Sequence, residues 1–108
     1  MPKRSISYRD TLLASLANPA EAALYLESAL EESPERFLIA LRDVAEARQM
    51  ATVAKDAGVA REALYRMLSD TGNPTYSSLS SVLAALGLRL AVTTLPDGEA
   101  LRAVEPRP

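Results

Sequence analysis

The stretch VAKDAGVAREALYRMLS, residues 53–69, holds two short apolar-striped segments that meet at Gly58. Glycine adopts the left-handed backbone conformation at little steric cost, so we expect the first helix to end at Gly58. Val59 should then be the apolar plug of the turn, and a second helix should run from about Ala60 to Ser69. This pattern is typical of two short helices packed at a steep angle. The residues expected to face inward are Val53, Ala54, Ala57, Leu64, Met67 and Leu68.

The outward side of the second helix carries charged and aromatic residues that suit a DNA major groove. Arginine can bond guanine O6 and N7 as a bidentate fork, and glutamate can accept a hydrogen bond from cytosine N4. An alternative for Glu62 is an ordinary solvated residue near a helix N-terminus. An alternative for Tyr65 is partial burial against the turn GNPTY at 72–76. The base-reading candidates are Arg61, Glu62, Tyr65 and Arg66, and the phosphate candidates are Arg48, Thr52, Lys55, Ser69 and Asn73.

Helix signals lie on both sides of this stretch. Asn18 suits the N-cap position and Pro19 the first helical position, and together they predict an acidic helix over 19–32. Ser33 and Pro34 repeat the signal at the start of a region, 34–87, that we interpret as a helix-turn-helix core. Its first helix has apolar residues at helical spacing, and its last helix ends at a glycine. These apolar residues are Phe37, Leu38, Leu41, Val44 and Ala45, followed by Leu79, Val82, Leu83 and Leu86 before Gly87.

The segment LRLAVTTL, residues 88–95, alternates apolar and other residues and predicts a β-strand. A lone strand needs a partner for its backbone groups, and the simplest partner is the same strand of a second copy. The candidate dimerisation residues are therefore Leu88, Leu90, Ala91 and Val92. We expect an N-terminal segment over 1–17 and a loose tail over 96–108.

The composition of the 108-residue chain favours one domain, 1–108, and excludes several kinds of chemistry. Cysteine and histidine are both absent, so thiol and imidazole catalysts, disulfides and Cys/His metal sites are excluded. With no Gly-rich phosphate loop either, we expect no enzyme activity, no metal and no cofactor. We also expect no membrane segment and a cytoplasmic location. The net charge is only −2, but residues 48–66 are locally basic and residues 19–46 are acidic.

Taken together, these segments resemble the antidote proteins of addiction modules, the antitoxin branch of the repressor-like helix-turn-helix family. The resemblance covers residues 8–95 and rests on four segments: YLESALEE (25–32), FLIALRDVAEARQM (37–50), VAKDAGVAREALYRMLS (53–69) and GNPTYSSLSSVLAALGLRL (72–90). It implies an all-α fold of five repressor-like helices, with an additional N-terminal helical segment and one C-terminal strand paired across a dimer. It also implies binding of a double-stranded DNA operator, repression of the module's own promoter, and neutralisation of a cognate basic toxin by direct contact.

The chain departs from the family pattern at the starts of the two motif helices. The family usually has serine or a similar cap there, whereas this chain has Ala51 and Ala60. Alanine cannot accept the capping hydrogen bond, which costs about 1 kcal/mol per helix. We therefore expect modest operator affinity unless Thr52 replaces the first cap.

The acidic helix over 19–32 is the candidate surface for the toxin. An acidic helix with an exposed aromatic residue suits a basic partner, although a run of charge is also an ordinary solvated face. The candidate contacts are Tyr25, Glu27, Glu31 and Glu32. Two other functions remain open: a helix-turn-helix regulator without a toxin partner, and a helical protein-interaction module that does not bind DNA.

Overall fold

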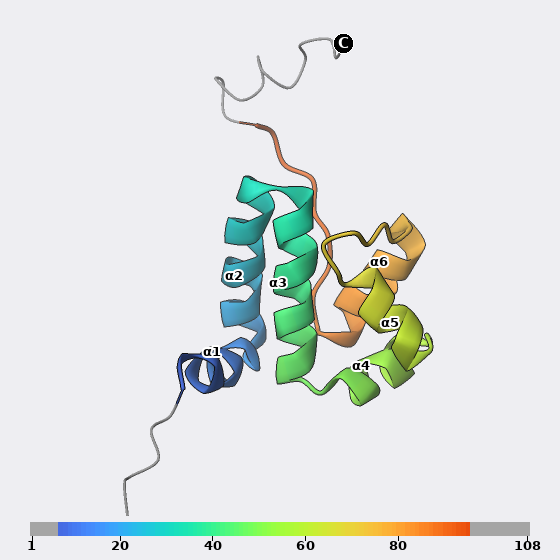
Figure 1. The fold of residues 1–108 in the computed structure, drawn as a ribbon. Coiled ribbons are helices and arrows are strands. Elements are labelled where there is room, and N and C mark those ends of the chain that lie inside the picture. The colour runs from blue at the N-terminus through green and yellow to red at the C-terminus, as the bar shows by residue number, and fades with distance from the viewer. Residues whose placement is uncertain (1–6, 96–108) are drawn as a thin grey trace, which may run out of the picture.

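The computed structural model describes residues 7–95, and within this range the chain forms six α-helices and no β-strand (Figure 1). The all-helical class is therefore confirmed. The expected tail over 96–108 and the first residues of the segment 1–17 lie outside the described residues. The helices are α1 (Tyr8–Leu16), α2 (Pro19–Glu32), α3 (Pro34–Ala47), α4 (Met50–Ala57), α5 (Arg61–Met67) and α6 (Tyr76–Ala85).

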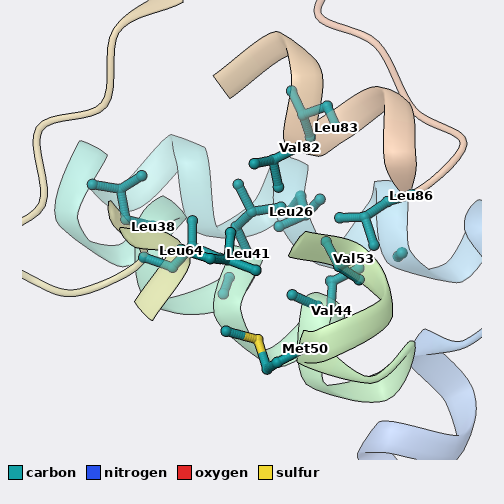
Figure 2. Packing of buried hydrophobic residues seen from close by; sticks show 14 of the residues in the cluster. Leu26, Leu38, Leu41, Val44, Met50, Val53, Leu64, Val82, Leu83 and Leu86 are labelled. Carbon is teal, nitrogen blue, oxygen red and sulfur yellow. The ribbon is translucent and has the colours of Figure 1, made fainter. Parts of the chain in front are cut away.

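Helix α3 is the centre of the fold. It lies beside α2, with α1 packed across one end of the pair and α4, α5 and α6 grouped on its other side (Figure 1). Figure 2 shows buried side chains from these elements converging on a shared core. Leu41 of α3 and Leu64 of α5 are fully buried there, because each lies on the apolar stripe of its helix. The inward residues predicted for α3 are all buried: Phe37, Leu38, Leu41, Val44 and Ala45.

The long helices begin where the capping residues predict. The Asn18 side chain accepts hydrogen bonds from the backbone N–H groups of Ala20 at 2.8 Å and Glu21 at 3.3 Å. The Ser33 hydroxyl accepts one from the N–H of Arg36 at 3.0 Å. Each bond satisfies a backbone donor that the first turn of a helix leaves without a partner. The predicted bounds of α2 are confirmed.

The stretch 53–69 forms two helices joined at Gly58, as predicted. Gly58 has φ 74° and ends α4 in the left-handed conformation. The N–H of Val59 donates to the carbonyl of Ala54 at 3.0 Å, and Val59 packs against the core as the expected plug. Helix α5 begins one residue later and ends two residues earlier than predicted, at Arg61 and Met67.

The capping of α4 differs from the prediction. Gln49, with φ 73°, is the residue before the helix, so Ala51 lies inside α4 instead of at its start. Thr52 does not replace the cap, because α4 has no side-chain capping bond. Ala60 does precede α5 as predicted, and it too provides no side-chain cap. Both helices therefore begin without a capping side chain.

The predicted strand over 88–95 is not formed in the single chain, and the prediction is corrected for the described residues of one copy. Gly87, with φ 79°, ends α6, and the N–H of Leu88 donates to the carbonyl of Leu83 at 2.8 Å. Beyond this turn, residues 88–95 form neither helix nor strand, and residues 88–91 and 93 share a groove with residues of α2 and with Phe37 at the start of α3. A strand requires a neighbouring ladder, and the described part of this single chain offers none. Leu88 is partly buried, whereas Val92 is 99 % exposed.

Candidate nucleic-acid interface

Helices α4 and α5 present exposed polar side chains around their shared turn. Arg61 and Glu62 lie in the first turn of α5, and Arg66 lies in its last turn; all three are exposed. Lys55 and Thr52 are exposed on α4. The inward residues Leu64 and Leu68 are fully buried, so packing against the core fixes which side of α5 faces solvent.

Tyr65 differs from the other base-reading candidates because it is partly buried and packs against the core. The guanidinium carbon of Arg61 lies 5.8 Å from the centre of the Tyr65 ring. The guanidinium carbon of Arg42, on α3, lies 5.1 Å from the same ring centre. Arg42 also forms an ion pair with Glu46, with 3.6 Å between Nε and Oε2. The ring of Tyr65 thus connects α5 to a charged residue of α3.

Arg42 was not among the predicted site residues. Its helical position predicts only an exposed charge beside the apolar stripe of α3. The i,i+4 spacing to Glu46 predicts the ion pair, but it says nothing about the ring of Tyr65. The contact depends on how α3 and α5 pack, so the sequence contains no local signal for it.

Three of the predicted residues gather beyond the C-terminal end of α5. Arg66, Ser69 and Asn73 line one shallow hollow, together with the turn at Gly72 and Pro74. The Ser69 hydroxyl donates to the carbonyl of Arg66 at 3.0 Å, so it also closes the end of the helix. The hollow lies next to α5, and the exposed Arg66 is part of its lining.

Arg48, another phosphate candidate, has a hydrogen-bond partner within the fold. It is partly buried at the end of α3, and its guanidinium donates to the carbonyl of Leu86 at 3.5 Å. That bond satisfies a carbonyl at the C-terminal end of α6. Arg48 therefore connects the C-terminal end of α3 to the C-terminal end of α6, a contact that the sequence did not indicate.

Tyr25 is not the exposed aromatic that the sequence predicted. It is partly buried, and its hydroxyl donates to Oδ2 of Asp43 on α3 at 2.6 Å. Burial, together with this hydrogen bond and the charge of Asp43, raises the pKa of Tyr25 to about 12. Arg9 of α1 pairs with Oδ1 of the same carboxylate at 3.0 Å and also with Glu46. Tyr25 is thus part of the polar contact between α1, α2 and α3.

The three predicted glutamates of the acidic helix are on the surface. Glu27, Glu31 and Glu32 are all exposed on α2. Glu32 forms an ion pair with Arg36, with 3.4 Å between Oε1 and Nε. The structure therefore leaves the carboxylates accessible while turning Tyr25 toward α3.

Acidic side chains in residues 7–95 form no group of three or more that could hold a metal ion. Over the same range, no helix has the length and apolar character needed to cross a membrane. The candidate interface is thus a surface of exposed side chains over α4 and α5.

Most of the chain matches a known protein family. A family model described as "Probable addiction module antidote protein" matches residues 10–94, which include the whole of α2 to α6. A protein of Haemophilus influenzae strain Rd, described as an uncharacterized protein, is 46 % identical over 78 residues. That match covers 71 % of this chain and 80 % of the relative. No solved structure matches.

Proposed function

Because the chain belongs to the family of probable addiction module antidote proteins, we propose that it is a non-enzymatic antitoxin that binds its own operator as a dimer. It represses transcription of its module and neutralises a small basic toxin by direct contact. The observation that carries this proposal is the match over residues 10–94, which includes two short helices joined at a left-handed glycine. The exposed Arg61 and Arg66 on the second of these helices support DNA as the ligand.

In the proposed complex, α4 and α5 act as a helix-turn-helix. The second helix of such a motif lies in the major groove with its N-terminal residues nearest the bases, which places Arg61 and Glu62 there. Arg66 follows about one turn later. Lys55 and Thr52 face the phosphate backbone, and Ser69 and Asn73 do so from the hollow beyond α5. Arg48 contributes to this surface chiefly by fixing the end of α3.

A competition gel-shift assay tests operator recognition. The purified protein should bind a duplex from its own promoter region more tightly than random DNA of the same length. Affinity should fall steeply with salt, because phosphate contacts release bound counterions. Equal retention of the two duplexes would overturn sequence recognition and leave a protein-interaction module as the better account.

The dimer is proposed to include the extended segment 88–95. Leu90 and Val92 are 38 % and 99 % exposed, and Leu90 lies at an apolar groove beside Leu30 and Phe37. A second copy would cover this surface and give the extended backbone a pairing partner. Leu88, Leu90, Ala91 and Val92 are the proposed contacts.

Sedimentation equilibrium tests this interface. Ala91→Pro removes a backbone donor and should weaken the dimer, and Val92→Asp should do the same by placing a charge at an apolar contact. Ser77→Asp adds the same charge at an exposed position of α6, outside the proposed interface, and is the matched control. If Ala91→Pro and Val92→Asp both sediment with the wild-type dimer constant, the interface lies elsewhere.

Toxin contact is proposed at the carboxylates of Glu27, Glu31 and Glu32. Their exposure on one helix supports a basic partner. Co-expression with a small basic protein encoded beside this gene should relieve the growth arrest that the partner causes. Replacing the three glutamates by glutamine should reduce that relief, whereas Asp70→Asn should not. If no neighbouring frame encodes such a protein, a regulator without a toxin partner is favoured.

A further inference from the structure

The side chain of Tyr65 lies where it can control the position of Arg61. The two residues are four apart on α5, so their side chains lie on the same side of the helix. The Arg61 guanidinium carbon is 5.8 Å from the ring centre, within the distance at which a cation is attracted to an aromatic face. Tyr65 is partly buried and Arg61 is exposed, so the ring is the fixed member of the pair.

The ring itself is held from a second helix. Arg42 of α3 places its guanidinium carbon 5.1 Å from the ring centre, and Glu46 pairs with Arg42. Packing against the core further restricts the Tyr65 side chain. A side chain anchored in this way has little freedom to turn toward a base.

An arginine that reads a base must hold its planar fork in one orientation. A free arginine side chain has many rotamers, and ordering it on binding costs free energy. Contact with a fixed ring removes part of that cost before DNA arrives, which favours the correct complex. Restricting the arginine side chain favours base reading more than phosphate contact, because a positively charged group can approach a phosphate from many directions.

We propose that Tyr65 is a positioning residue that orients Arg61 for base reading, and that it is not itself a base reader. The inference rests on the proposed DNA-binding function. The aromatic ring is the part that acts, so the hydroxyl is dispensable for this role.

Operator preference, the ratio of the dissociation constants for scrambled and operator duplexes, measures this role. Tyr65→Leu should lower the ratio about 2-fold to 5-fold, the range expected for a cation on an aromatic face at an exposed site. Tyr65→Phe keeps the ring and should retain the wild-type ratio. Tyr8→Leu, a change at an 81 % exposed tyrosine of α1, is the control for loss of an aromatic side chain. Thermal melts of each variant separate loss of folding from loss of preference.

A double-mutant cycle provides the decisive comparison. If Tyr65 acts through Arg61, adding Tyr65→Leu to Arg61→Ala should produce no further loss of operator preference. A further loss equal to that of Tyr65→Leu alone would mean that Tyr65 reads DNA independently, and the inference would be overturned. An unchanged ratio for Tyr65→Leu in the wild-type background would overturn it as well.

NMR of the free protein tests the contact without DNA. The side-chain resonances of Arg61 should be displaced by the ring current of Tyr65, and Tyr65→Leu should abolish that displacement while Tyr65→Phe preserves it. Absence of any ring-current displacement would refute the positioning role even if operator preference exists. If the wild-type protein shows no operator preference, the proposed function is refuted, and so is a role for Tyr65 in reading DNA. The NMR result would still show whether Tyr65 and Arg61 are in contact.

Discussion

The hydrogen bond from Tyr25 to Asp43 should contribute a measurable amount to the free energy of unfolding. Replacing Tyr25 by phenylalanine removes the hydroxyl that donates to Oδ2 at 2.6 Å, and it leaves the ring in place. Asp43 keeps its ion pair with Arg9, so the carboxylate is not left without a partner. The loss is therefore confined to one charge-assisted hydrogen bond at a partly buried site.

The size of the effect follows from the type of hydrogen bond and from its partial exposure to solvent. A hydrogen bond to a charged group contributes about 1.5–3 kcal/mol, and screening by solvent at this partly exposed site lowers the expected loss to about 1–2 kcal/mol. Burial is the largest cause of the raised pKa of Tyr25, so the size of that rise does not measure the strength of this hydrogen bond. Each kcal/mol corresponds to a fall in Tm of about 4–8 °C in a domain of this size.

The same bond predicts how stability depends on pH. Because folding raises the pKa of Tyr25, the contribution is fully present below about pH 10 and is lost as the pH rises through about 12. The difference in unfolding free energy between wild type and Tyr25→Phe should therefore shrink across this interval. Urea unfolding followed by circular dichroism at pH 7, 10 and 11.5 measures it. Tyr76→Phe, at a 75 % exposed tyrosine, is the matched control.

Two results would refute this reasoning. One is a Tyr25→Phe variant as stable as wild type at pH 7, which would mean that the bond contributes nothing in solution. The other is a stability difference that stays constant between pH 10 and pH 11.5, which would mean that folding does not raise the pKa of the Tyr25 hydroxyl.

Two further predictions concern the core and the turns. Leu41→Ala should lower the unfolding free energy by about 2–5 kcal/mol, because the side chain is fully buried on the central helix. Urea unfolding measures this change, and a loss below about 1 kcal/mol would contradict the burial of Leu41. Gly58→Ala should cost about 1–2 kcal/mol from the left-handed backbone alone, since no atom lies within 4 Å of an added Cβ. Gly72→Ala should cost more, because its Cβ would overlap the Met67 carbonyl group; thermal melts that reverse this order would contradict the geometry of the turn.

The parts of the fold that could be predicted are those governed by neighbouring residues. Asn18 and Ser33 determine where α2 and α3 begin because a capping side chain bonds amides only two or three residues away. Gly58 ends α4 for a similarly local reason. Gln49 is a contrary case: it is a non-glycine residue with φ 73° before α4, a conformation that its residue type does not indicate.

The parts that could not be predicted depend on contacts between distant segments. Alternation over 88–95 suits a strand, but a strand forms only beside a partner, and residues 7–95 of one chain supply none. The contacts of Tyr25 with Asp43 and of Tyr65 with Arg42 each join two helices whose relative rotation no local pattern specifies. For this reason Tyr25, predicted to be exposed, is partly buried, and Tyr65 takes the partly buried alternative.

Binding of wild type, Arg61→Ala and Lys55→Ala to operator and scrambled duplexes at several salt concentrations tests the central claim most directly. Both side chains are exposed on helices that tolerate alanine, and thermal melts control for folding. We predict that Arg61→Ala costs about 1–3 kcal/mol on the operator and much less on scrambled DNA. Lys55→Ala should weaken both duplexes alike and reduce the salt dependence by about one phosphate contact. Equal losses on both duplexes for Arg61→Ala, or no change for either variant, would contradict the assignment of α5 as the helix that reads DNA.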